Sequence, residues 1–228
     1  NINFDVFPFA SITVSIEKIF PSWVGWIKGH ELSKTLSLTS NRKRILKDLS
    51  HFDGKECVIG QMPKSLKFID GRTIKEFKEH HELPSDAAAL LKLCELTKGS
   101  AILFIRSVSS FLLEKFLFSP RSIIASNGLS TAERGFKHER NTSTFTEFLK
   151  RAKERNDITF EKAVAKISSI PAKKYSITDR VSIRENYFAD MVIWRENQPT
   201  HVLVNGRIAL EEGVLKEMAG APLRSKKP

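Results

Sequence analysis

The chain has 228 residues, 41% hydrophobic and 28% charged, which excludes a disordered protein and suits one large core or two small ones. Its net charge is +11, but the 37 Lys and Arg are spread along the chain and form a run only at 224–227, without a nucleic-acid-binding motif. No segment has the ~20 consecutive apolar residues of a membrane span, so we expect neither nucleic acid nor a membrane as partner.

Strands and helices are predicted in alternation over the first 128 residues, from apolar runs and helical spacing bounded by Pro, Gly, Ser and Asn. In chain order they are a strand at 2–9, a helical turn at 15–19, a helix at 42–49 capped by Ser40-Asn41, a strand at 56–60, a helix from Thr73, a helix from Asp86 to Gly99, a strand at 100–106, a helix at 111–118 and a strand at 122–126 closed by Asn127-Gly128. This alternation favours an α/β fold with parallel strands.

The last third of the chain changes character. Amphipathic helices are predicted at 145–153 and 160–167. After Pro171 the chain becomes strand-like, with short strands at 191–194, 201–204 and 207–210. Asn205-Gly206 separates two of these strands, and an Asn-Gly pair between apolar runs is a strong hairpin signal. A small β module therefore follows the α/β part.

Three segments near the C-terminus resemble the urease-like amidohydrolase superfamily. They are 160–172 (FEKAVAKISSIPA), 183–192 (IRENYFADMV) and 201–206 (HVLVNG), the last followed by Glu212-Gly213. The earlier half is similar to one family of that superfamily, the N-acyl-D-amino-acid deacylases or D-aminoacylases. The segments concerned are 5–9 (DVFPF), 19–24 (IFPSWV), 72–77 (RTIKEF), 84–87 (PSDA), 122–128 (SIIASNG) and 138–145 (HERNTSTF).

The resemblance implies the C-terminal half of a zinc-dependent deacylase. Residues 1–170 would be the last strands and helices of a TIM-type barrel with insertions, and 171–228 the C-terminal strands of a small β module. The implied reaction is hydrolysis of the amide bond of N-acyl-D-amino acids by a metal-activated water with an acid–base group. The family's zinc ligands lie on earlier barrel strands, before the position at which this sequence begins.

The chain itself offers no pattern of metal ligands. It has no His-x-His, and Cys57 and Cys94 have neither ligand spacing nor a disulfide scaffold around them, so we expect a buried thiol at Cys94. His80 and His81 are adjacent on a predicted helix and point to different sides, among Lys and Glu, which favours a solvated face. We expect no zinc or other cofactor in this chain alone.

Asn127 stands where the resemblance places the family's catalytic Asp, beside the metal. An amide keeps the shape of a carboxylate and can hydrogen-bond, but it does not accept and return a proton at neutral pH. The alternative reading is that Asn127-Gly128 is only a turn after a buried strand. With the resemblance, a lost catalytic carboxylate is the favoured interpretation.

The resemblance also implies three substrate-binding positions. Phe7 and Phe9 replace a Tyr pair of the family, so the hydroxyl that would orient the substrate carboxylate is missing. Arg140 persists, and its guanidinium fork suits the grip of an α-carboxylate. For Arg140 an exposed loop residue is the equal alternative, and for His138 a structural role is favoured over a catalytic one.

The favoured reading is therefore a fragment or degenerate member of a zinc-dependent N-acyl-D-amino-acid deacylase, inactive alone. A second is a half-enzyme that works only with a separate N-terminal chain, and a third is a non-catalytic binding protein on the same scaffold. We expect an N-terminal half chain or self-association as partner. We also expect a cytoplasmic location. Because the chain opens on a strand without Met, we expect a segment upstream of it, and a signal peptide in that segment stays an open alternative.

Overall fold

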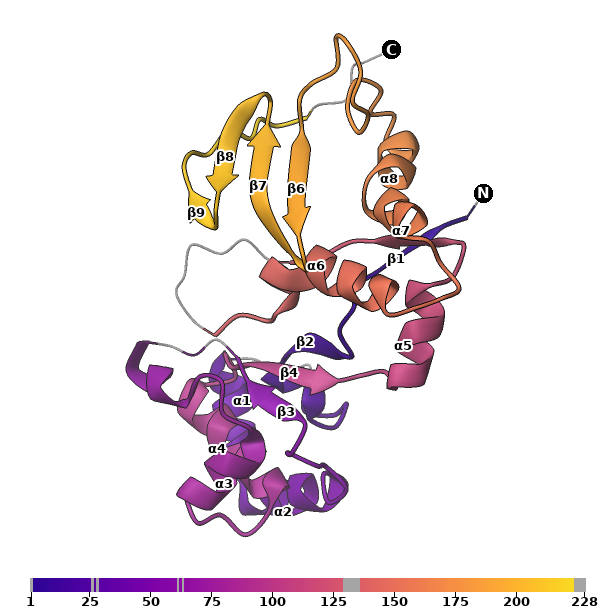
Figure 1. The fold of residues 1–228 in the computed structure, drawn as a ribbon. Coiled ribbons are helices and arrows are strands. Elements are labelled where there is room, and N and C mark those ends of the chain that lie inside the picture. Colours follow the sequence, from indigo (N-terminus) through magenta and orange to yellow (C-terminus); the bar gives the residue numbers. More distant parts are fainter. Residues whose placement is uncertain are drawn as a thin grey trace. The chain divides into compact units, whose positions relative to one another are not determined.

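The computed structural model describes residues 2–223, apart from 26, 28, 61, 63 and 129–135 (Figure 1). The chain folds into two compact units. The first comprises residues 1–8, 115–126 and 143–228, and the second comprises 9–114 and 127–142. These units are interleaved along the sequence and do not coincide with the ranges 1–170 and 171–228, whose assignment to a barrel and a β module stays a prediction. None of the helices that the structure describes is long and apolar enough to cross a bilayer.

The first unit contains a pair of parallel strands formed by segments far apart in the sequence. Strand β1 (Phe4–Val6) pairs with β5 (Ser122–Ile124), with Phe4 opposite Ser122 and Val6 opposite Ile124. The pairing continues one step further, because Ala125 N donates to Val6 O at 3.1 Å. Both strands lie where the sequence predicts them, shortened at their ends.

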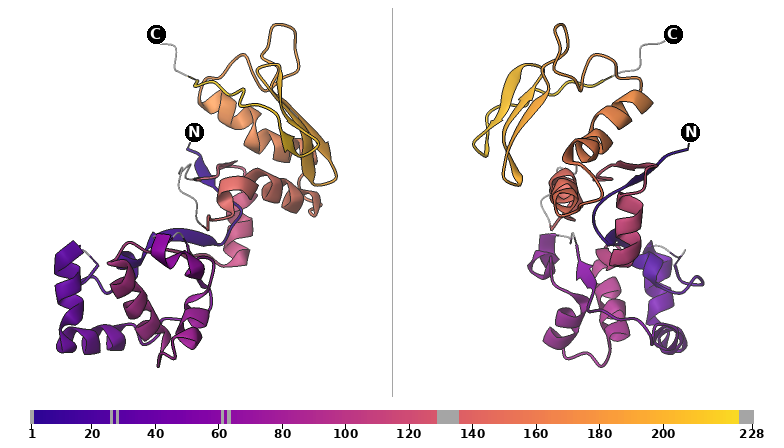
Figure 2. Two further views of the ribbon diagram at one scale, coloured as in Figure 1. Left: turned by 90° about the vertical axis from the view of Figure 1, so that its left-hand side faces the viewer. Right: turned by 45° about the vertical axis from the view of Figure 1, so that its right-hand side comes forward.

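A four-stranded antiparallel sheet makes up the C-terminal part of this unit and lies beside the last two helices (Figure 2). Its strands are β6 (Met191–Arg195), β7 (Gln198–Val204), β8 (Arg207–Glu211) and β9 (Val214–Leu215). Asn205 and Gly206 have φ of 53° and 79°, the left-handed values of a hairpin turn, so the predicted hairpin is confirmed. No residue of these four strands is buried on either face.

The helices associated with the first unit are α6 (Arg140–Lys153), α7 (Phe160–Ile167) and α8 (Ser169–Lys174). Helix α7 has the predicted bounds, and Thr159 caps it, since Lys162 N donates to Thr159 Oγ1 at 3.3 Å. Helix α8 continues three residues past Pro171, and the predicted strands follow from Met191 onward. Pro171 is the third residue of α8, and in a first turn its missing N–H would have no partner in the helix anyway.

The second unit is built on a three-stranded sheet in the order β2-β4-β3. Strands β2 (Ser11–Ser15) and β3 (Cys57–Ile59) both run antiparallel to β4 (Ile102–Arg106). The prediction of parallel strands is thus wrong for this sheet and holds for β1 and β5. The connection from β3 to β4 contains η2, α3 and α4 instead of the single helix of a parallel crossover.

The helices of this unit and its sheet share the main hydrophobic core, whose residues run from Ile16 to Leu103. They are the 3-10 segments η1 (Ile16–Ile19) and η2 (Lys64–Ile69) and the α-helices α1 (Gly29–Ser37), α2 (Thr39–Asp48), α3 (Ile74–His80) and α4 (Asp86–Thr97). Helix α5 (Ser110–Leu117) then leads toward β5.

The local signals for α3 and α4 are confirmed. Thr73 and Glu76 form a capping box, and Ser85 accepts from Ala88 N at 3.1 Å. The predicted cap Ser40-Asn41 is wrong, because α2 already begins at Thr39. Asn41 instead donates its amide to Thr35 O at 3.0 Å, which satisfies a carbonyl at the end of α1.

Candidate functional site

The carboxyl ends of β1 and β5 lie side by side, and two predicted site residues follow them. Phe7 comes directly after β1, and Asn127 follows β5 after two residues. In α/β folds the loops at the carboxyl ends of parallel strands carry the catalytic groups. Phe7 belongs to the first unit and Asn127 to the second, so a common part in a site stays a prediction.

Asn127 is exposed and has φ of 45°, a left-handed conformation that Asn tolerates better than most residues. Its side chain forms no hydrogen bond with any residue that the structure describes. A turn accounts for this conformation as well as a catalytic position does. Its assignment to the acid–base position stays a prediction.

His138 holds the start of α6 against β2 in the second unit. Its Nδ1 accepts from Arg140 N at 3.1 Å, so the ring proton is on Nε2. Nε2 then lies 2.9 Å from Ser11 O and 2.8 Å from Ser11 Oγ. Burial lowers the pKa of His138, with a smaller contribution from the nearby charge of Arg140. Because both ring nitrogens are engaged in a neutral, 6% exposed ring, the geometry supports the structural role.

Two aromatic rings enclose His138 edge-on. The ring centroid of Phe9 lies 5.6 Å from that of His138, and the centroid of Phe104, on β4, lies 5.1 Å away. Phe9 is partly buried. Phe7 is also partly buried but belongs to the first unit, and its predicted part in substrate binding stays a prediction, as does that of Phe9.

Arg140 is the first residue of α6 and is only 6% exposed. The alternative that it is an exposed loop residue is therefore wrong. Burial lowers the pKa of its guanidinium, which still carries its charge at neutral pH. Its predicted part in binding a substrate carboxylate stays a prediction.

No cluster of three or more His, Cys, Asp or Glu that could hold a metal ion occurs among the residues that the structure describes. His80 and His81 are both exposed, with ring centroids 5.1 Å apart and nearly perpendicular, as the solvated-face reading predicts. Cys57 and Cys94 are fully buried, and burial raises the pKa of each thiol to about 12. Neither cysteine can act as a ready nucleophile.

Lys166 is a buried charge that the sequence analysis missed. It is 6% exposed, on α7, and its ammonium donates to Ser119 O at 2.5 Å, Ser122 O at 3.0 Å and Ser122 Oγ at 2.8 Å. Burial lowers its pKa. Its spacing on the helix could have revealed this burial, because Lys166 follows the buried Ala163 by three residues and lies on the same face.

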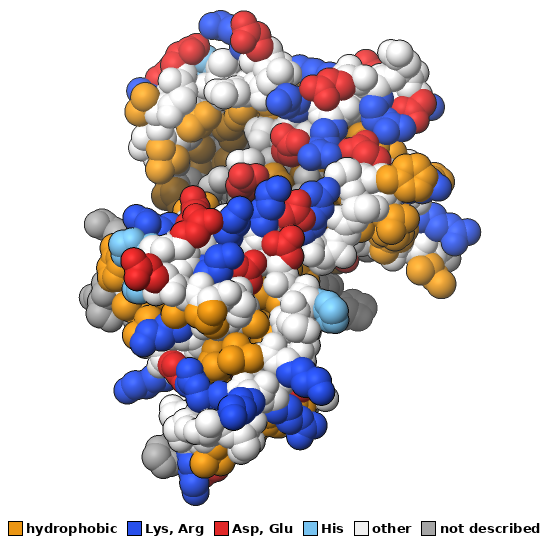
Figure 3. All heavy atoms as spheres, turned by 90° about the horizontal axis from the view of Figure 1, so that it is seen from below, with side chains coloured by type: hydrophobic (Ala, Val, Ile, Leu, Met, Phe, Trp, Pro, Cys, Tyr) orange, Lys and Arg blue, Asp and Glu red, His pale blue; other side chains and the backbone are white. Residues whose placement is uncertain are grey.

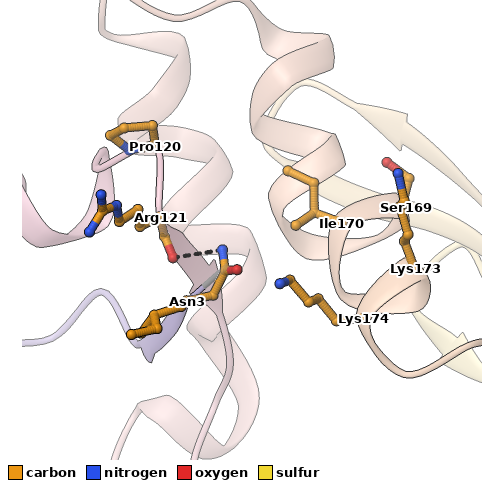
Figure 4. Close-up of a pocket in the computed structure, with 8 residues that line it drawn as sticks. Asn3, Pro120, Arg121, Ser169, Ile170, Lys173 and Lys174 are labelled. Carbon is orange, nitrogen blue, oxygen red and sulfur yellow. Dashed lines mark hydrogen bonds between the residues drawn. The ribbon is translucent and has the colours of Figure 1, made fainter.

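A cavity of about 970 Å³ lies at the opposite, amino-terminal end of β1 and β5 (Figure 4). Asn3 and Arg121 line one side, joined by the hydrogen bond from Asn3 Nδ2 to Arg121 O at 3.0 Å, and Ile170 and Lys174 of α8 line the other. Figure 4 shows the Lys174 ammonium directed toward Asn3, whereas the Arg121 side chain points away. The cavity contains none of the predicted site residues.

Comparison of the sequence with family profiles finds no match, and comparison with curated proteins finds none either. The fold, however, matches solved structures. One is D-aminoacylase, described as defining a novel subset of amidohydrolases, with a TM-score of 0.65 and 17% identity over 96% of this chain. An N-acyl-D-glutamate deacylase from Bordetella bronchiseptica, complexed with zinc and a phosphonate inhibitor, matches 92% of the chain with a TM-score of 0.60 and 15% identity.

A mutant D-aminoacylase in complex with copper chloride matches over 99% of the chain, with a TM-score of 0.66 and 18% identity. This chain spans only 40–43% of the length of these proteins. At such identities the similarity is one of fold. The chain is thus an α/β protein with the architecture of the C-terminal portion of D-aminoacylase structures.

Proposed function

We propose that this chain is the C-terminal part of a degenerate amidohydrolase of the D-aminoacylase type, which needs residues outside its own sequence and an Asp in place of Asn127 to hydrolyse N-acyl-D-amino acids. The observation that carries the proposal is the parallel pair β1–β5, whose carboxyl ends lead to Phe7 and Asn127, within a fold that matches D-aminoacylase over 96% of the chain. The reaction and the substrate are those that the resemblance implies.

The sheets of the first unit support the idea that strands from outside this sequence, here called the complement, complete the fold. A parallel pair of strands has an unpaired edge on each side, and parallel sheets are normally larger and covered on both faces. Ile2 and Phe4 are 85% and 38% exposed on β1 or next to it. The four-stranded sheet has no buried residue, which is unusual for an antiparallel sheet with a core face. Both features favour further strands supplied by an N-terminal half or by another chain.

The described residues do not fit the zinc of the family. No three potential ligands lie together in the part of the chain that the structure describes, whereas a catalytic zinc site has three protein ligands. We therefore assign no step of a metal reaction to these residues. The ligands are expected from the complement.

What this chain contributes in the proposal is substrate binding and an impaired proton transfer. Arg140, a buried cation, binds the α-carboxylate of the substrate by two parallel hydrogen bonds. Asn127 lies at the position of the acid–base group, where its amide can orient a water or the substrate but cannot take up a proton. The chain is thereby inactive for two separate reasons, the absent complement and the amide.

The test is complementation with the N-terminal portion of D-aminoacylase, followed by hydrolysis of N-acetyl-D-amino acids. The chain alone and the complex with Asn127 are expected to be inactive, and the complex with Asn127→Asp to gain about 10²–10⁴-fold, the usual contribution of general acid–base catalysis. Arg140→Ala in the active complex raises KM, whereas Arg195→Ala, at an exposed position of β6, leaves it unchanged. Equal activity of the Asn127 and Asn127→Asp complexes would exclude the assigned role.

A second function, a half-enzyme that is active with its natural partner chain, differs only in the origin of the complement. It would show hydrolysis with native Asn127 once that partner is present. The third, a non-catalytic protein on the same scaffold that binds nucleic acid or another ligand, has less support, above all for nucleic acid. On the face shown in Figure 3 the Lys and Arg side chains are mixed with Asp and Glu instead of forming a continuous basic patch. Its test is a steep salt dependence of association.

A further inference from the structure

The sequence contains two Asn-Gly pairs, Asn127-Gly128 and Asn205-Gly206. This dipeptide is the one most prone to deamidation, because glycine has no Cβ to hinder attack of its main-chain nitrogen on the preceding amide. Both Asn residues have left-handed backbones, with φ of 45° and 53°. The two pairs therefore allow one chemistry to be compared in two environments.

Asn205 is held at both ends of its amide. Oδ1 accepts from Arg180 Nη2 at 2.7 Å, and Nδ2 donates to Ala219 O at 2.8 Å. The main chain is also fixed, since Asn205 N donates to Asp190 Oδ1 at 2.8 Å. For the Cγ of Asn205 to meet the nitrogen of Gly206, the amide must turn and these bonds must break.

Asn127 has no such restraint from the described part of the chain. Its side chain is exposed, lies outside helix and strand, and forms no hydrogen bond with any described residue. The amide can therefore rotate toward the following nitrogen without breaking a bond of its own. Hydrogen bonds thus restrain the amide of Asn205, whereas none from a described residue restrains the amide of Asn127.

We propose that Asn127 is a site of spontaneous deamidation, selected over Asn205 by the fold. The main-chain nitrogen of Gly128 forms a bond to Cγ of Asn127, and the Cγ–Nδ2 bond breaks. Nδ2 leaves as ammonia and takes the proton lost by the Gly128 nitrogen. Water then opens the cyclic imide at Cγ to give Asp, or at the main-chain carbonyl to give isoaspartate. One water is consumed and one ammonia released, and no cofactor takes part.

If the proposed function holds, on which this step rests, the reaction supplies the missing catalytic group. The Asp product carries a carboxylate that can accept and return a proton at neutral pH. The isoaspartate product has an additional methylene in the main chain, which displaces the carboxylate and remains inactive. The complemented complex would then gain activity as the chain ages, to the extent that the imide opens toward Asp.

The experiment follows both Asn-Gly peptides of the intact chain by mass spectrometry during incubation at neutral pH, in native buffer and in urea. In urea both peptides gain the mass of NH₂ replaced by OH at similar rates. In native buffer the Asn127 peptide keeps its unfolded rate within a few-fold, whereas the Asn205 peptide slows by at least about tenfold, because its hydrogen bonds must be broken first. Asn127→Gln identifies the peptide, since a longer amide does not form the five-membered ring.

An Asn127 peptide that reacts as slowly as the Asn205 peptide in native buffer would overturn the proposal, as would equal rates that are unaffected by folding. Activity is measured separately. If the aged chain carries Asp at 127 but the complemented complex stays inactive, the catalytic assignment of this position fails while the deamidation stands. If Asn127→Asp is active but the wild-type chain never gains mass, the deamidation fails and the proposed function stands.

Discussion

Replacement of Lys166 by Met tests whether the buried ammonium stabilises the first unit. The unbranched Met retains much of the apolar stem and removes the three donors of the ammonium. Ser119 O keeps Ser122 N at 3.1 Å and Ser122 Oγ at 2.9 Å as donors, so the loss falls on Ser122 O. A buried acceptor without a partner costs about 1–3 kcal/mol, partly offset because a charge no longer has to be buried. The expected net loss in the free energy of unfolding is about 1–2 kcal/mol.

The measurement is urea unfolding followed by circular dichroism, with Lys162→Met as control. Lys162 is exposed on the same helix, so its replacement changes stability by at most about 0.5 kcal/mol. The midpoint for Lys166→Met falls and the slope stays the same. A Lys166→Met protein as stable as the wild type would show that the cost of burying the charge cancels its hydrogen bonds, and the reasoning would be refuted.

Three further predictions concern other residues. Folding lowers the pKa of His138 below 6.5, so the unfolded chain takes up the proton first as the pH falls. The stability present at neutral pH is therefore lost as the pH falls below 6.5, which urea midpoints at a series of pH values measure. A His138→Gln protein whose stability depends on pH with the same slope would contradict this prediction. Cys57 and Cys94 are expected to resist a thiol reagent in the native state and to react fully in urea; rapid native labelling would show that the core opens. Gly99→Ala is expected to lower the thermal unfolding temperature more than Gly213→Ala. Both glycines have nearly the same φ (+78° and +77°), but only at Gly99 would a Cβ approach Leu32 Cδ2, at 2.8 Å. Equal losses of stability would assign the whole effect to the backbone.

The sequence predicts well those elements whose signals are local. Thr73, Ser85 and Thr159 cap helices because the groups they satisfy lie within three residues, and Asn205-Gly206 specifies its own turn. The strand at Ser11–Ser15 was not predicted, since its pairing with β4 involves residues about ninety positions away.

In the candidate site too, features with local causes could be predicted and features with distant causes could not. The end of β5 before Asn127 could be predicted from the breaker pair that follows it. The burial of Arg140 and the early start of α6 could not. Both depend on His138, whose ring accepts the Arg140 N–H and contacts Ser11, 127 residues earlier in the chain. Such a contact leaves no trace in the local pattern of either segment.

The pairing of β1 with β5 has a consequence for the order of events during synthesis. Phe4 leaves the ribosome long before its partner Ser122, and the intervening chain must be closed into a loop at an entropic cost that grows with its length. The antiparallel pairing of Ser11 with Arg106 shortens that loop, because it brings the two ends of the intervening segment to opposite positions on adjacent strands. The sheet of the second unit is therefore expected to form first, and β1 waits as a nascent, unpaired segment until residue 124 has been added.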